Sequence, residues 1–113
     1  MLAVATGKSD RGLAHCMAAN GIANLFASLQ TADRHPSKPD PSMIEAVLAD
    51  TAIDRCDAVM IGDTSFDMLM AGAAEVRAIG VAWGYHPAEE LLSTGARAVA
   101  QTAAELSRML EAR

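Results

Sequence analysis

Aromatic residues, basic charge and long apolar runs are scarce in this sequence. Only 4% of its 113 residues are aromatic, so alanine, valine, leucine and methionine must fill a core. The formal net charge of −5 argues against a basic face that could neutralise nucleic-acid phosphates. No run approaches the roughly 20 apolar residues that span a bilayer. We therefore expect neither a nucleic-acid nor a membrane partner.

Cysteine motifs and leader signals are also missing. Cys16 and Cys56 stand alone, without Cys-x-x-Cys spacing, and this favours reduced thiols in a cytosolic protein. Met1 enters the first apolar run directly, without the basic flank and long apolar core of a signal peptide. These absences predict a cytoplasmic protein.

What is present is an alternation of strand and helix signals. Apolar residues make up 51% of the chain, enough for the core of one domain over residues 1–113. Strands are expected at 2–6, 27–32, 58–62, 76–83 and 96–100, with helices opening near residues 9, 41, 65, 86 and 102. This alternation predicts a parallel sheet covered on both faces. Because a domain seldom opens inside a buried strand, we expect that upstream residues are missing.

Two helices carry recognisable end signals. Ser9 or Asp10 can cap the first helix, and Gly21 suits the left-handed position that follows it. Pro41 suits the first position of the next helix, with Asp40 as its cap.

The stretch from 58 to 68 organises the candidate site. Its apolar part, 58–62, is typical of a buried strand and would carry Asp63 to the strand's carboxyl end, where open α/β sheets bind ligands. Asp67, in the first turn of the next helix, would face the same point. Two carboxylates at a helix N-terminus suggest a hard cation such as Mg²⁺, with a phosphate-bearing ligand.

Two other strand ends would add polar groups along the same edge of the sheet. Thr6 and Gly7 end the first strand, where a hydroxyl and adjacent N–H groups can hold phosphoryl oxygens. Lys38 lies in the loop after the second strand, where it can offset the charge of a phosphate. We therefore predict phosphate binding by Thr6, Gly7 and Lys38, beside a metal site formed by Asp63 and Asp67.

Structural explanations compete with each of these assignments. Asp63 could be only a turn residue after a strand, and Asp67 only a favourable charge at the start of a helix. Lys38 could be a solvated loop residue, and Thr6 could be a helix cap. Each signal is weak alone, but their order and placement together are specific.

Two other motifs do not support a function. The nucleotide-binding phosphate loop needs a glycine five residues before the Gly-Lys-Ser at 7–9, and Leu2 holds that position. The three histidines lack metal-ligand spacing and are expected at the surface or at helix ends; they are His15, His35 and His86.

Five segments occur in the order of one family's motifs. Residues 2–9, 38–41 and 62–68 resemble the second, third and fourth motifs of the haloacid dehalogenase superfamily, and 80–85 and 86–91 resemble its phosphoglycolate phosphatase-like members. The resemblance runs through nearly the whole chain. It implies a Rossmann-like, three-layer α/β/α domain and a Mg²⁺-dependent hydrolase of small phosphorylated metabolites.

The resemblance also implies a role for each site residue. Thr6 corresponds to the phosphate-binding hydroxyl, assisted by Gly7, and Lys38 to the lysine that offsets phosphate charge. Thr6 and Lys38 are thereby the candidate catalytic residues. Asp63 corresponds to the Mg²⁺ ligand, while Asp67 would support the metal or the lysine.

The nucleophile of the family has no counterpart here. Members begin with a strand ending in Asp-x-Asp, whose first aspartate attacks the phosphate and whose second acts as general acid and base. No two aspartates of this sequence are separated by a single residue, and the helical cap that selects substrate is absent too. The chain therefore resembles the carboxyl-terminal half of such a phosphatase. We expect a fragment with negligible phosphatase activity on its own.

The absent strand has a structural consequence. In the family it lies at the sheet centre, between strands that correspond to 2–6 and 58–62. Its removal leaves either a slot about two strand spacings wide, with unpaired edges, or a sheet that has closed up. We expect that the flanking strands pair directly or that another chain fills the gap, so a homo-oligomer formed through exposed strand edges is one expectation.

Two other functional classes compete with a phosphatase. A truncated, non-catalytic remnant or interaction module would keep the fold with at most weak Mg²⁺ or phosphate binding. A receiver-type domain phosphorylated at Asp63 is disfavoured, because receivers also need an acidic cluster after their first strand. Intact mass measured after treatment with a small acyl phosphate would test that alternative.

Overall fold

Parallel strands alternate with helices along the chain, as the sequence predicted. The computed structural model describes residues 1–84 and 86–111, so Tyr85, part of one motif noted above, lies outside the described residues. The elements are β1 (Leu2–Ala5), α1 (Asp10–Asn20), η1 (Ala23–Leu25), β2 (Phe26–Gln30), α2 (Ser42–Thr51), η2 (Arg55–Asp57), β3 (Val59–Gly62), α3 (Ser65–Ala73), β4 (Arg77–Val81), α4 (Ala88–Ser93), β5 (Ala98–Ala100) and α5 (Ala103–Glu111). Each of these five strands is one to three residues shorter than expected.

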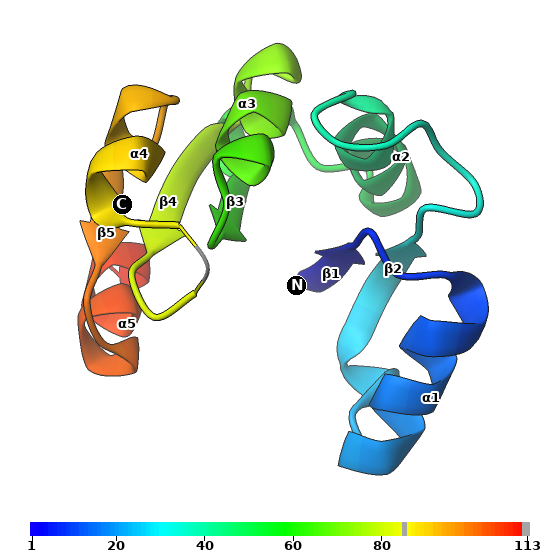
Figure 1. Cartoon of the computed structure of the whole chain (residues 1–113). Helices are drawn as coiled ribbons and strands as arrows, with labels where there is room; N and C mark the ends of the chain where they lie inside the picture. Colours follow the sequence, from blue (N-terminus) through cyan, green and yellow to red (C-terminus); the bar gives the residue numbers. More distant parts are fainter. Residues whose placement is uncertain (85, 112–113) are drawn as a thin grey trace.

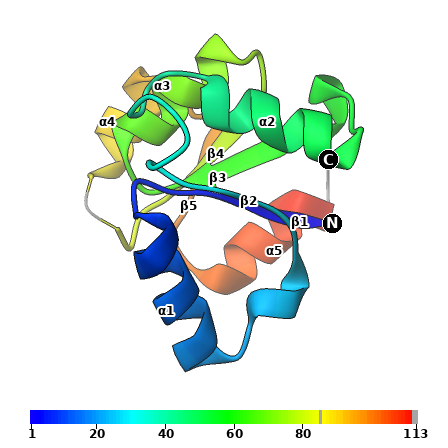
Figure 2. The ribbon, with the colours of Figure 1, turned by 90° about the vertical axis from the view of Figure 1, so that its right-hand side faces the viewer.

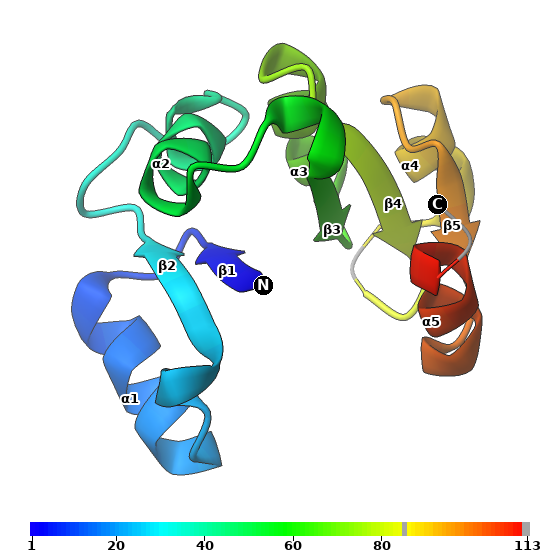
Figure 3. The ribbon, with the colours of Figure 1, turned by 180° about the vertical axis from the view of Figure 1, so that it is seen from behind.

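The strands form two separate sheets. β1 pairs with β2, while β3, β4 and β5 form a second sheet in that order, and every pairing is parallel. Figure 1 and, from behind, Figure 3 show β1 and β3 as the facing edges of the two sheets. The expectation that β1 and β3 pair directly is wrong. The structure contains one chain, so the alternative, that another chain fills the gap, stays a prediction.

Helices that cover the two sheets contribute to one buried cluster. α2 packs on β1 and β2, and α3 packs on β3 and β4. Met43 and Ile44 of α2 share one buried cluster with Met68 and Met70 of α3. Side chains of α2 and α3, and not a strand pairing, therefore connect the two sheets in the described residues.

Helices cover both faces of the strands, as predicted. Figure 2 shows α2, α3 and α4 above the strands and α1 and α5 below them. The same view shows β1 and β3 running in one direction, so their carboxyl ends lie at one edge. None of the helices in the described part of the chain is long and apolar enough to cross a membrane.

The helix-end signals are largely confirmed. The Ser9 hydroxyl accepts the Gly12 N–H at 3.0 Å at the start of α1, and Gly21 ends that helix with φ of 64°. α2 begins one residue later than expected, at Ser42. Asp40 Oδ1 accepts the Ser42 N–H at 2.9 Å, so Asp40 caps the start of the helix as predicted. Pro41 precedes the first helical residue instead of being it.

Candidate functional site

Asp67 is fixed at the start of α3 by a reciprocal cap. Thr64 donates its N–H and hydroxyl to Asp67 Oδ2, at 3.3 and 3.0 Å, and Thr64 Oγ1 accepts the Asp67 N–H at 3.2 Å. This capping box supplies partners for N–H groups that the first helical turn leaves free. The structural role considered for Asp67 is therefore present, and sequence reasoning missed Thr64 as its partner.

Lys38 reaches Asp67 from the loop that follows β2. Its Nζ lies 2.5 Å from Asp67 Oδ1, and the side chains are 21% and 5% exposed, respectively. Lys38 is thus a largely buried charge partner and not a freely solvated loop residue. Because both Asp67 oxygens have donors, the geometry favours Asp67 as the residue that holds Lys38. Direct metal ligation by Asp67 stays a prediction.

Asp63 lies at the carboxyl end of β3 with its carboxylate available. Its carbonyl oxygen accepts the His86 N–H at 3.2 Å, but no residue in ranges 1–84 and 86–111 donates a hydrogen bond to its carboxylate. The side chain is half-buried and opens onto a pocket of about 540 Å³ whose lining includes Trp83. An ionised carboxylate with free oxygens is the ligand type that Mg²⁺ prefers.

Two glycines leave the space that the Asp63 and Asp67 carboxylates occupy. A Cβ on Gly62 would overlap the Asp67 side chain, and a Cβ on Gly84 would overlap that of Asp63. Any larger residue at either position would therefore displace a site carboxylate. Sequence reasoning placed these glycines within segments 62–68 and 80–85 but gave them no structural role, because their contacts are visible only in three dimensions.

His86 supports the same corner of the site. Its Nδ1 accepts the N–H of buried Ser65 at 2.9 Å, and its ring centroid lies 6.0 Å from that of Phe66. The histidine thus satisfies a further N–H of the first turn of α3. His86 lies just before α4, which agrees with the predicted helix-end position. Its hydrogen bond with Ser65 of α3 joins residues 21 positions apart in the sequence, and no sequence signal pointed to that bond.

Thr6 and Gly7 lie at the end of β1, across the gap from the residues above. The Thr6 N–H donates to Gln30 O at 3.0 Å, and Thr6 Oγ1 accepts the Lys8 N–H at 3.2 Å. Ser9 caps α1, so the alternative of Thr6 as its cap is wrong. Within the described residues, no hydrogen bond or ion pair joins Thr6 or Gly7 to Lys38, Asp63 or Asp67.

The Lys38 loop is tied to α1 at its beginning. Asp10 accepts the Thr31 hydroxyl at 2.7 Å and pairs with Arg34 at 3.2 Å, and the Asp10 N–H donates to Asp33 Oδ2 at 2.7 Å. The hydrogen bond from Thr31, aided by the charge of Arg34 and opposed by desolvation, lowers the pKa of Asp10 from its ordinary 3.8. These contacts also explain why β2 ends at Gln30 and not at the predicted residue 32.

The contacts of Asp10 predict that the protein loses stability as the pH falls. The folded-state pKa of Asp10 is the lower one, so its stabilising effect is complete above pH 3.8 and disappears as the pH falls through the folded-state value. We expect Asp10→Asn to flatten the dependence of Tm on pH between about 5 and 2. Thermal melts followed by circular dichroism test this, with Asp54→Asn as control. Equal slopes for Asp10→Asn and wild type would contradict it.

A polar network holds the loop against α2. His35 bonds Ser42 through Nδ1 and Gln30 through Nε2, both at 2.6 Å. The Gln30 amide then donates to Ser28 and Asp50, each at 2.9 Å. His35 is therefore a half-buried link between β2 and α2, not the expected surface or helix-end residue. The inner face of β2 is polar because this network occupies it.

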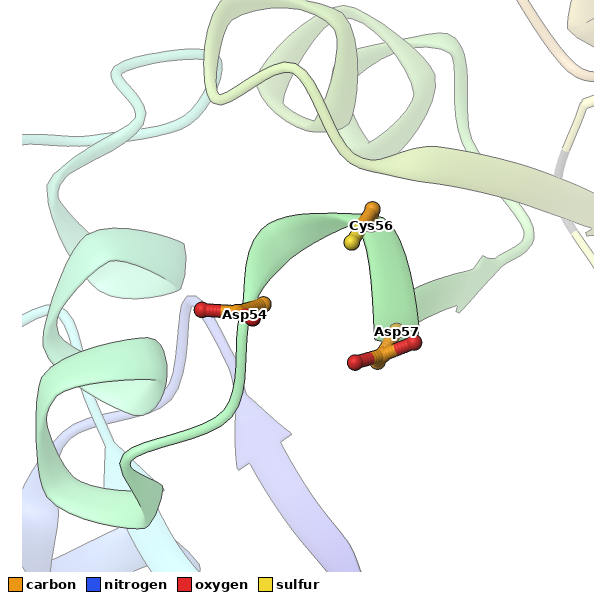
Figure 4. Close-up of side chains that lie close together, drawn as sticks. All are labelled: Asp54, Cys56 and Asp57. Atoms are coloured by element: carbon orange, nitrogen blue, oxygen red, sulfur yellow. The ribbon is translucent and has the colours of Figure 1, made fainter.

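A second acidic group lies at the opposite end of β3. Asp54, Cys56 and Asp57 around η2 place possible ligand atoms within 4.8 Å of one another, and all three residues are exposed (Figure 4). The group precedes β3 whereas Asp63 follows it, so the two are separate. Exposed acidic groups of this kind are common without a bound ion, and we assign this one no function.

Comparisons with known proteins give matches over most of the chain. The family model described as haloacid dehalogenase-like hydrolase matches residues 1–81. The chain is 35% identical over 107 residues to the protein named Probable phosphatase IndB of Dickeya dadantii, covering 93% of this chain and 46% of that protein. It is 30% identical over 86 residues to the phosphoglycolate phosphatase of Photobacterium profundum, covering 75% and 38%.

A solved structure extends the match to three dimensions. The crystal structure of a hydrolase from Pseudomonas syringae superposes with a TM-score of 0.82 and 26% identity, over 97% of this chain and 51% of that one. The chain thus spans about half the length, or less, of the proteins that it matches. The α/β fold with parallel strands is the shared architecture.

Proposed function

Because this chain belongs to the haloacid dehalogenase-like hydrolases, we propose that it forms the cation- and phosphate-binding half of a phosphate monoester hydrolase site. The observation that carries the proposal is the cluster at the end of β3. There Lys38 is fixed by Asp67 at 2.5 Å while the adjacent Asp63 carboxylate has free oxygens. A fixed lysine ammonium group beside a carboxylate with free oxygens suits the binding of a metal ion and a phosphoryl group.

Each residue has a distinct part in this proposal. Asp63 would hold Mg²⁺, and Asp67 would keep Lys38 aimed at the phosphate or join the metal. Thr6 and Gly7 would bind phosphoryl oxygens from the end of β1. Mg²⁺, when bound, would polarise the phosphoryl oxygens and lower the cost of developing negative charge. The free Asp63 carboxylate supports this assignment, since Mg²⁺ binds through one or two carboxylates plus substrate oxygens.

The proposed substrate class is a small phosphorylated metabolite. A relative named phosphoglycolate phosphatase motivates this choice, as does the exposed pocket beside Asp63. The cytoplasmic location expected from the sequence belongs to the same proposal. Negligible turnover by the 113-residue chain is expected, because the sequence has no Asp-x-Asp pair to supply the attacking carboxylate.

Mg²⁺ binding by Asp63 provides the direct test. We expect a Mg²⁺ titration followed by NMR to shift the amides of Asp63 and Thr64 saturably. Asp63→Asn should weaken this binding by about tenfold or more, because an amide lacks the charge that a hard cation requires. Inorganic phosphate added with Mg²⁺ should shift the amides of Thr6 and Gly7.

Asp54→Asn is the matched control, because it removes one carboxylate from the exposed group at the other end of β3. It should leave the Asp63 response unchanged, and equal weakening by both variants would contradict a specific site. Turnover of an aryl phosphate is measured in parallel. Mg²⁺-dependent turnover that Asp63→Asn abolishes would overturn the expected inactivity of the isolated chain.

A non-catalytic interaction module is the second candidate. It is favoured by the unpaired edges of β1 and β3, which invite association. Gel filtration with and without Mg²⁺ and phosphate separates the candidates. A stable oligomer with no response to either ion supports the interaction module, whereas saturable ion binding by a monomer supports the phosphatase half-site.

A further inference from the structure

The segment between β4 and α4 lies directly against Asp63. This segment, called the β4–α4 loop below, is described at residues 82–84 and 86–87. A Cβ on Gly84 would overlap Asp63 Cβ and Oδ2, so the backbone of the loop packs closely against that carboxylate. The orientation of the Asp63 side chain therefore depends on where the loop lies.

His86 ties the β4–α4 loop to both ends of the turn that carries Asp63. Its backbone N–H donates to Asp63 O at 3.2 Å, and its ring Nδ1 accepts the Ser65 N–H at 2.9 Å. Only one residue separates Asp63 from Ser65, so the two bonds bracket the turn between β3 and α3. Because Ser65 is only 7% exposed, loss of this acceptor would leave a buried backbone donor without a partner.

The same bonds define the protonation of the His86 ring. A backbone N–H can only donate, so the Nδ1 that accepts it carries a lone pair and no proton. The proton of the neutral ring is then on Nε2. Glu90 Oε2 lies 3.6 Å from Nδ1, but Nδ1 cannot donate to Glu90 while it accepts from Ser65. The geometry thus favours the hydrogen bond with Ser65 over an ion pair with Glu90.

Phe66 restrains the ring from a second direction. The ring centroids of Phe66 and His86 lie 6.0 Å apart with an interplanar angle of 59°. Such tilted arrangements are favoured between aromatic rings. The His86 side chain is 25% exposed, so most of it is covered by the protein. These contacts keep Nδ1 directed at the start of α3.

We propose that His86 is a positioning residue for Asp63. His86 would hold the β4–α4 loop against the turn, and Gly84 of that loop would then keep the Asp63 carboxylate where Mg²⁺ binds. The inference rests on the proposed function, because the role has meaning only if Asp63 binds a metal ion. Residues that orient a metal ligand commonly change metal affinity about 10–100-fold when they are replaced.

The hydrogen bonds of His86 argue against direct ligation of the metal by its ring. A histidine ligates through a ring nitrogen with a free lone pair. The Ser65 N–H already occupies the lone pair of Nδ1, and Nε2 holds the proton. His86 therefore acts through Asp63, by fixing the loop that packs on it.

Two variants of His86 in the full 113-residue chain separate its acceptor from its bulk. His86→Asn keeps an acceptor, Oδ1, near the position of Nδ1, whereas His86→Leu fills similar space without one. A Mg²⁺ titration followed at the Asp63 amide by NMR should show about tenfold weaker binding for His86→Leu. His86→Asn should stay within about threefold of wild type, because the Ser65 N–H keeps a partner. Equal weakening by both variants would contradict the proposal.

Two measurements without metal test the hydrogen bond itself. Long-range proton–nitrogen correlation spectra of the wild type, in mildly alkaline buffer, should show His86 protonated at Nε2 and not at Nδ1. Amide exchange at Ser65 should be faster in His86→Leu than in wild type or His86→Asn. Glu90→Gln is the control and should leave both Mg²⁺ affinity and Ser65 exchange unchanged. A proton on Nδ1, or a Glu90→Gln variant that behaves like His86→Leu, would overturn the assignment.

Failure of this role can be told apart from failure of the proposed function. Absence of saturable Mg²⁺ binding by the wild type would overturn both. Saturable binding by the wild type that His86→Leu leaves unchanged would overturn the positioning role alone. Weaker binding by His86→Leu together with rescue by His86→Asn would support both.

Discussion

Replacing Lys38 with methionine is expected to lower the free energy of unfolding by about 3 kcal/mol, because it leaves a buried carboxylate without its charge partner. Asp67 is 5% exposed and pairs with Lys38 at 2.5 Å. The three bonds within the Thr64 capping box remain, which keeps the expected loss at the lower end of the range for broken buried pairs. Urea unfolding at neutral pH measures the change.

Lys8→Met is the matched control, since Lys8 is exposed and no ion pair involving it is found in the described part of the chain. Its effect should stay below about 0.5 kcal/mol. A double-mutant cycle with Asp67→Asn should give a coupling energy of about 1 kcal/mol or more. Equal effects of Lys38→Met and Lys8→Met would show that the pair contributes little.

Shortening Leu91 to alanine is expected to cost about 3 kcal/mol, the range for a large apolar side chain removed from a packed core. Leu91 is 0% exposed and belongs to the main buried cluster. A Cβ on Gly80 would lie 2.8 Å from Leu91 Cδ1, so this side chain packs directly against β4. Leu91 therefore holds α4 against the second sheet.

Leu92 offers a control of the same size and chemistry. It is the next residue of α4 and is 50% exposed. Leu92→Ala should change the unfolding free energy by less than about 0.5 kcal/mol. Thermal and urea unfolding of both variants give the comparison. Losses of similar size would mean that α4 docks by another face than the one observed.

Local sequence signals predicted the order of elements well. The apolar run at 58–62 and the helix that follows it are both found, because a strand end and a helix start depend on neighbouring residues. The same reasoning placed Asp63 after β3 and Lys38 in a loop that reaches the site. Where tertiary contacts decide the outcome, prediction failed. β2 was expected to run to residue 32, but Thr31 bonds Asp10 of α1 instead.

The remaining parts of the site depend on contacts between distant residues. Gly84 is close to Asp63, and His86 bonds Ser65, only after β4 has returned beside β3. Neither relation has a local spacing rule that one sequence could reveal. The separation of β1 from β3 likewise is visible only in the folded chain. No local signal reveals whether β1 and β3 pair or stay apart.

The two sheets are connected by side chains. No strand pairing joins β1 to β3 in the described residues, whereas Met43 and Met68 belong to one buried cluster and Lys38 pairs with Asp67. Because these contacts cross from one sheet to the other, they couple the unfolding of the two. A single cooperative unfolding transition would therefore depend on these side chains.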